Sequence, residues 1–123
     1  MSEDNKLRVV MVEPGKPAYE TEIENTLAGE QRAVGGYIEV LPLDNEKLLI
    51  CNEEGKLNGM RGNRRIGNDV IAGPFFIVGE DGDEFRSLTD EEVKASLKRF
   101  AEPEEITQEE VENALSAGVM FFG

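Results

Sequence analysis

A basic segment punctuated by glycines is the first place where this sequence could hold a ligand. Residues 55–68 contain no acid and carry four bases, which are Lys56, Arg61, Arg64 and Arg65. Arginine offers a planar fork that matches phosphate or carboxylate, and glycines let successive backbone N–H groups point into one concavity. Tyr37 or Phe75 could then stack on the base of a nucleotide. The spacing matches neither a P-loop nor a dinucleotide fingerprint, and the same bases could instead neutralise the acidic part of the protein.

The C-terminal third of the chain is strongly acidic and suggests a different kind of contact. Residues 80–112 contain thirteen acids and four bases. Carboxylates ordered along a helix can imitate a row of phosphates and occupy a nucleic-acid-binding protein, although a surface that simply keeps the protein in solution has the same composition. Residues 119–122 then place four apolar side chains in the tail. We expect them to pack on the protein's own sheet; docking on a second copy or a partner is the alternative.

Residues for enzymatic chemistry are scarce. The chain has no histidine, which removes Ser-His-Asp and Cys-His catalysis and histidine metal sites. The single cysteine, Cys51, sits in an apolar run and is typical of a small buried residue. Asp81 and Asp83 lack the rest of a calcium loop and suit a hairpin turn. We predict no catalytic residue, no metal site and no cofactor; an enzyme would have to use carboxylates, tyrosine, Cys51 or a carboxylate-bound metal.

Length and composition set the broad class. A chain of 123 residues is the size of one domain and can bury a core without disulfides. The net charge of −13 disfavours direct binding to nucleic acid unless the bases are segregated. The polar, acidic N-terminus does not resemble a secretory signal, and no apolar run approaches the ~18 residues of a membrane span. We therefore expect a cytoplasmic protein without a membrane partner.

The first half of the chain is predicted to form four strands and one helix. Residues 7–12 form an apolar run, and a Pro-Gly turn connects it to the alternating residues 19–24, which indicates a hairpin. Asn25 or Thr26 can cap a short helix that ends at Gly35 and Gly36. Two further strands are predicted, at residues 37–42 and 47–52.

The second half begins with a predicted loop and ends in helices. The loop covers residues 55–68, and the apolar strand 69–79 follows, bent at its Gly-Pro pair, before a tight turn into a short strand. Thr89 and Thr107 each open a helix with a capping box. The predicted fold is α+β, a single domain with a mostly antiparallel sheet of five or six strands, one short helix after the second strand and two C-terminal helices. Residues 1–100 would form the domain, and residues 101–123 a helical extension packed on it.

Five segments in this order resemble a known family. They are VEPGK at 12–16, VGGYIE at 34–39, ICNEEGK at 50–56, NR at 63–64 and IAGPFFIVG at 71–79. The pattern is similar to a bacterial domain family of unknown function, common in Gram-positive bacteria and especially on their phages and conjugative elements. The resemblance runs from about Leu7 to Phe100. It implies no activity, cofactor or catalytic residue, but it implies a setting in which small accessory proteins bind host factors or sequester nucleotide signals of host defence.

Two functions from different classes follow. The first is a non-enzymatic accessory protein of a phage or mobile element, monomeric or homodimeric, which engages a host or phage protein through its acidic residues 91–112 and its apolar tail. Added salt should weaken such a complex, because exposed charges are screened over ~8–10 Å. The alternative is a binder or sponge of a small phosphorylated ligand, such as a nucleotide signal, held by Lys56, Arg61, Arg64 and Arg65 with Tyr37 or Phe75.

Overall fold

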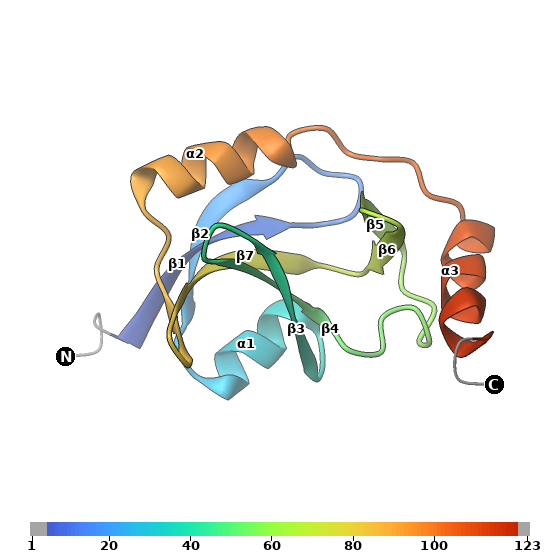
Figure 1. The fold of residues 1–123 in the computed structure, drawn as a ribbon, viewed down its shortest axis with the longest axis horizontal. Coiled ribbons are helices and arrows are strands. Elements are labelled where there is room, and N and C mark those ends of the chain that lie inside the picture. Colours follow the sequence, from blue (N-terminus) through green and yellow to red (C-terminus); the bar gives the residue numbers. More distant parts are fainter. Residues whose placement is uncertain (1–4, 121–123) are drawn as a thin grey trace.

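The computed structural model describes the backbone of residues 5–120 and the side chains of residues 5–116. Within these ranges the chain forms eight strands and three helices (Figure 1). The elements in chain order are β1 (Lys6–Val12), β2 (Tyr19–Glu24), α1 (Leu27–Val34), β3 (Ile38–Asp44), β4 (Lys47–Asn52), β5 (Gly62–Ile66), β6 (Asp69–Ala72), β7 (Phe75–Asp81), β8 (Glu84–Arg86), α2 (Asp90–Arg99) and α3 (Gln108–Met120). The predicted α+β class is confirmed, with one helix after the second strand and two C-terminal helices.

The main sheet is antiparallel throughout. Its strand order is β2-β1-β7-β4-β3, and β8 pairs with β7. The two edges are therefore β2 and β3. The central strands β1, β7 and β4 are the most apolar and the most buried, as strands covered on both faces must be.

The two faces of the sheet pack against different helices. Alternation along β1 sends Val9 and Met11 to the face covered by α1, and Val10 and Val12 to the face covered by α2. On the α2 face, the Phe100 ring meets Phe75 edge-on, with centroids 5.3 Å apart. Figure 1 shows α1 and α2 on opposite sides of the sheet.

Local chemistry sets the ends of the helices much as the sequence predicts. Thr26 caps α1 by accepting a hydrogen bond from the backbone N–H of Gly29, and Gly35 ends the helix in the left-handed region at φ 82°. Thr89 and Glu92 form the complete capping box of α2. At α3 only half of the predicted box is present, because Thr107 accepts from the backbone N–H of Glu110 while the Glu110 carboxylate binds elsewhere.

The prediction of a continuous loop over residues 55–68 is wrong in its second half. Residues 62–66 form β5, which pairs with β6 as a separate antiparallel hairpin. Gly67 and Asn68 form its two-residue turn between the paired Ile66 and Asp69, and Gly67 has φ 59°. Such a turn suits Gly-Asn because one residue must adopt positive φ.

The hairpin lies under α3. Val111 of α3 is fully buried against Val70 and Ala72 of β6, with Met60 and Ile106 at the margin. The helix α3 thus packs on the β5–β6 hairpin. The predicted apolar tail, residues 119–123, lies outside the residues whose side chains are described. In the described part of the chain, no helix is both long and apolar enough to cross a membrane.

Candidate functional site

The four bases of residues 55–68 do not converge on one concavity. Lys56 Nζ lies 2.6 Å from Asp69 Oδ1. Arg65 makes ion pairs of 2.6 Å with Glu110 and 3.1 Å with Glu104, which tie β5 to the start of α3. The Arg61 guanidinium lies over the β1–β2 turn, where a Cβ added to Gly15 would be 3.0 Å from its terminal nitrogens.

Arg64 is buried, with 1% of its surface exposed, and cannot grip a ligand at the surface. Its Nη2 donates to the backbone oxygens of Lys16 and Phe100 at 2.8 and 2.9 Å, and its Nη1 donates to Asn63 Oδ1 at 2.8 Å. Burial lowers the pKa of the guanidinium, and the negative charge of Glu104 acts in the opposite direction. Phe100 is the C-cap of α2, so the cation meets the negative end of a helix dipole. Arg64 therefore joins the β1–β2 loop, β5 and α2.

The two predicted aromatic residues also separate. Phe75 is fully buried in the core on the α2 face, whereas Tyr37 is 69% exposed just before β3. Of the predicted residues, Lys56 and Tyr37 line two different hollows, which share Asn52 and Glu54 where the loop after β4 begins. That region is the best candidate for a functional surface.

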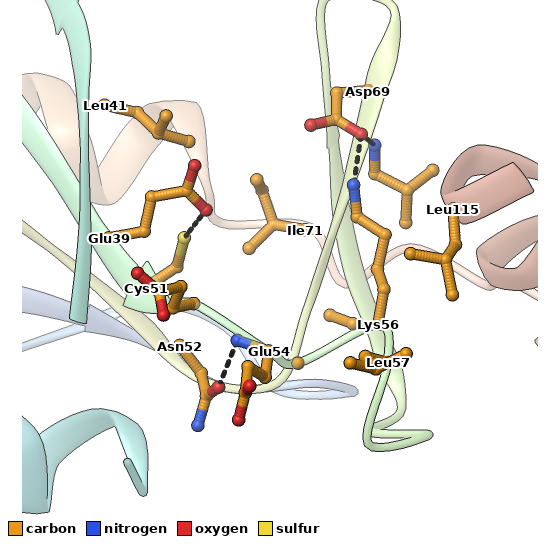
Figure 2. Close-up of a pocket in the computed structure, with 14 residues that line it drawn as sticks. Glu39, Leu41, Cys51, Asn52, Glu54, Lys56, Leu57, Asp69, Ile71 and Leu115 are labelled. Carbon is orange, nitrogen blue, oxygen red and sulfur yellow. Dashed lines mark hydrogen bonds and ion pairs between the residues drawn. The ribbon is translucent and has the colours of Figure 1, made fainter. Parts of the chain in front are cut away.

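A cavity of about 220 Å³ opens at this end of the molecule (Figure 2). One wall is the α2 face of the sheet, where Glu39 and Cys51 are cross-strand neighbours on β3 and β4. The opposite walls are the β4–β5 loop with Lys56 and Leu57, the strand β6, and Leu115 from α3. Figure 2 shows the Glu39 carboxylate on one side of the cavity, the Lys56–Asp69 pair on the other, and Ile71 between them.

The cavity is acidic. Glu39, Glu53, Glu54 and Asp69 line it together with a single base, Lys56, which already binds Asp69. The Cys51 thiol points at Glu39 Oε1 across 4.0 Å. Desolvation, followed by the charge of Glu39, raises the pKa of Cys51 to about 12. The thiol therefore stays protonated at neutral pH and supplies no thiolate nucleophile.

A second hollow of about 280 Å³ adjoins the first and lies beneath Tyr37. The two hollows share Asn52 and Glu54. Asn52 fixes this junction, because its Nδ2 donates to the Val34 carbonyl at 3.1 Å and its Oδ1 accepts from the Glu54 backbone N–H at 2.8 Å. The same side chain thus joins the end of α1 to the β4–β5 loop.

Two large apolar side chains stand beside these hollows. Tyr37 is 69% exposed and Leu57 is 67% exposed, and each lines one of the hollows. We call this surface the Tyr37–Leu57 site; its principal residues are Tyr37, Glu39, Asn52, Glu54, Lys56 and Leu57.

The electrostatics of the Tyr37–Leu57 site favour a cation over an anion. Four carboxylates against one base would repel a phosphate, so the geometry gives no support to the phosphorylated-ligand alternative. Among the described residues, no group of three or more metal-ligating side chains could hold a metal ion. The chemistry available is recognition by carboxylates, an amide and two apolar side chains.

Several acids of the predicted acidic surface serve the fold instead. Asp90 of α2 binds Arg8 of β1 at 2.6 Å, and Glu92 binds Arg86 of β8 at 2.8 Å. Glu104 and Glu110 bind Arg65, as described above. Reversing the charge of Glu104 or Glu110 would therefore weaken the attachment of α3 to β5. Variants at these two positions cannot show whether the acidic residues 91–112 contact a partner protein.

Sequence reasoning missed Glu39, Asn52, Glu54 and Leu57. One signal was present, because Leu57 is an apolar residue placed among Gly, Lys and Asn in a predicted loop. No local pattern shows that Glu39 points into the same cavity as the loop after β4, since this follows from the pairing of β3 with β4.

A comparison with protein families matches residues 7–101 to a family described as "Domain of unknown function (DUF3846)". No curated protein and no solved structure matches the chain at significant similarity. The matched segment contains the main sheet except for its first residue, Lys6, together with α1, α2 and the β5–β6 hairpin, and it ends before α3.

Proposed function

The chain belongs to the DUF3846 family of unknown function, and we propose that it is a non-enzymatic binding module that holds a partner protein at the Tyr37–Leu57 site. The observation that carries this proposal is the exposure of Tyr37 and Leu57 beside two adjoining hollows. Binding energy at protein interfaces concentrates in a few large anchors, especially aromatic residues and arginine, that fill pockets and are surrounded by polar groups.

The arrangement supports a contact made without large rearrangement. Asn52 holds the loop from two sides, and the backbone N–H of Glu53 donates to the Tyr37 carbonyl at 2.8 Å. The segment before β3, which carries Tyr37, is therefore hydrogen-bonded to the start of the β4–β5 loop, which carries Leu57, before any partner arrives. Preorganisation of this kind reduces the entropy lost on binding.

The proposed setting is the bacterial cytoplasm, where the protein would act as an accessory factor of a phage or mobile element and engage a host or phage protein. The motif pattern of residues 12–79 supports this setting through the resemblance stated above. A role against host defence is one form that such binding would take.

The test uses the full chain as bait in extracts of its own host. We would compare the wild type with the double variant Tyr37→Ser/Leu57→Ser and with Leu27→Ser, each checked for folding by circular dichroism. Leu27 is a matched control because it is 60% exposed at the opposite end of α1. The partner found in this way would then be purified and titrated by calorimetry.

The expected result is a protein retained by the wild type and by Leu27→Ser but lost by the double variant. In titration, the loss of a hot-spot residue of ~2 kcal/mol weakens binding roughly thirtyfold. If every retained protein binds the double variant as well as the wild type, the Tyr37–Leu57 site is not the interface and the proposal is wrong.

A further inference from the structure

We infer that the Tyr37–Leu57 site recognises a basic segment of its partner, with one long cationic side chain entering the cavity beside Glu39. This inference rests on the proposed function and names the chemistry of the partner. Three independent features of the site support it: the composition of the cavity walls, the unpaired carboxylates and the exposed aromatic ring.

The walls of the cavity suit an aliphatic stem that carries a terminal charge. Leu41 and Ile71 line it from the sheet and the hairpin, and Leu115 lines it from α3. Lysine and arginine bury their methylene stems along such apolar surfaces while the charged head reaches a polar partner. An uncharged apolar side chain would fit the walls but would leave the Glu39 carboxylate desolvated beside it, which is unfavourable.

The carboxylates available to the partner are those that form no ion pair within the protein. Within the described part of the chain, Glu39, Glu53 and Glu54 make no ion pair with a base, whereas Asp69 is held by Lys56. Among the side chains that the structure describes, only the weakly donating Cys51 thiol is placed to donate to Glu39. Carboxylates that accept hydrogen bonds from a cationic donor form the stronger class of polar contact, and this capacity is unfilled at Glu39 and Glu54.

The second hollow offers a place for a neighbouring cation. Tyr37 presents its exposed ring beside Glu54. A guanidinium or ammonium group stacked on an aromatic face gains cation–π energy, and arginine can also bind a carboxylate through its planar fork. Because Glu54 lies between the two hollows, a segment with two nearby basic residues could occupy both.

The charge of the whole chain acts in the same direction. At −13, the protein attracts basic partners over a Debye length and increases their association rate. This general attraction must be separated from recognition at the site, so the test compares variants of equal net charge.

The probe is a fluorescein-labelled peptide of alternating lysine and glycine, with a glutamate–glycine peptide of the same length as the negative probe. Fluorescence anisotropy would compare the wild type with Glu39→Gln/Glu54→Gln and with Glu109→Gln/Glu112→Gln. Glu109 and Glu112 are exposed on α3 and form no ion pair among the described residues. Both double variants change the net charge equally.

The expected result is binding of the lysine probe that the site variant weakens at least tenfold, as the loss of charge-assisted contacts predicts. The α3 variant should stay within about twofold of the wild type, since it removes only diffuse attraction. The inference is overturned if the wild type does not bind the lysine probe, if both double variants weaken binding equally, or if neither does.

A failure of the inference can be told apart from a failure of the proposed function. If the partner depends on Tyr37 and Leu57 but binds Glu39→Gln/Glu54→Gln normally, the binding module stands and its preference for a basic segment is wrong. If the probe requires Glu39 and Glu54 but no protein depends on Tyr37 and Leu57, the cavity binds cations and the proposed function is wrong.

Discussion

Replacing Arg64 by methionine should destabilise the whole fold. The side chain is almost fully buried, and its four hydrogen bonds end on the carbonyls of Lys16, Asn63 and Phe100 and on Asn63 Oδ1. Methionine fills a similar volume but donates no hydrogen bond. The variant would therefore remove the guanidinium's bonds to these oxygens, and the Phe100 carbonyl would keep only its bond from the Ala18 backbone N–H. This would weaken the junction between the β1–β2 loop, β5 and α2.

The expected cost follows from those contacts. Hydrogen bonds to a charged group contribute about 1.5–3 kcal/mol each, and an orphaned buried acceptor costs about 1–3 kcal/mol. These values do not add fully, and methionine also removes a charge whose burial is unfavourable, as the lowered pKa of Arg64 shows. We expect the free energy of unfolding to fall by about 3–5 kcal/mol, a large part of the stability of a domain this size.

Urea unfolding at neutral pH, followed by circular dichroism, measures this loss directly. Arg61→Met is the control, because Arg61 is an exposed base of the same segment and should change stability by about 0.5 kcal/mol or less. A cost below about 1 kcal/mol for Arg64→Met at an unchanged m-value would refute the structural role. The guanidinium would then be free for another task, such as the anion binding that its sequence context suggests.

Two further predictions concern the capping box of α2 and the loop beside the cavity. The hydrogen-bonded ion pair with Arg86 is the main cause that lowers the pKa of Glu92 to about 2. The ionised carboxylate therefore stabilises the fold fully above its ordinary pKa near 4.5, and this stabilisation is lost as the pH falls toward 2. Glu92→Gln should therefore cost at most about 3 kcal/mol at pH 7 and progressively less between pH 4.5 and 2 in urea titrations, and a gap that does not change with pH would contradict this. Gly55→Ala should lower the thermal midpoint of unfolding more than Gly59→Ala. A Cβ at Gly55 would lie 2.4 Å from the Ala72 carbonyl oxygen, whereas a Cβ at Gly59 would meet nothing within 4 Å, so that only the φ of 74° disfavours alanine there. Equal thermal midpoints for the two variants would show that the loop moves freely away from β6.

The features that could be predicted from the sequence are those set by short-range chemistry. Thr26 and Thr89 cap helices because a hydroxyl at that position satisfies a free backbone N–H. Gly35 ends α1 because the left-handed region suits a residue without Cβ. Alternation in residues 19–24 and the apolar runs of β1, β4 and β7 identified the strands of the sheet, and hence the fold class.

The functional assignments could not be predicted in the same way because they depend on burial and on distant partners. Arg64 and Arg65 are adjacent in the sequence and equally basic, yet they lie on opposite faces of β5, so that one is buried and the other pairs with the loop before α3 and with α3 itself. Nothing within the segment 55–68 distinguishes them. The roles of the acids in α2 and α3 are equally hard to predict. In the sequence, Glu92 and Glu110 look like ordinary surface residues, and only the fold shows that they form ion pairs with Arg86 and Arg65.

The residues of the five family-like segments have two kinds of role: some connect distant parts of the core, and others form the surface of the protein. Asn63 donates to the carbonyls of Val12 and Gly73, both at 2.9 Å, and Arg64 reaches Lys16 and Phe100, so this dipeptide holds both ends of the segment that matches the family. These hydrogen bonds of Asn63 and Arg64 do not involve α3. The cavity does depend on α3, because Leu115 of α3 lines its wall and lies outside the matched segment. A match to the family over residues 7–101 therefore does not by itself fix the shape of the cavity.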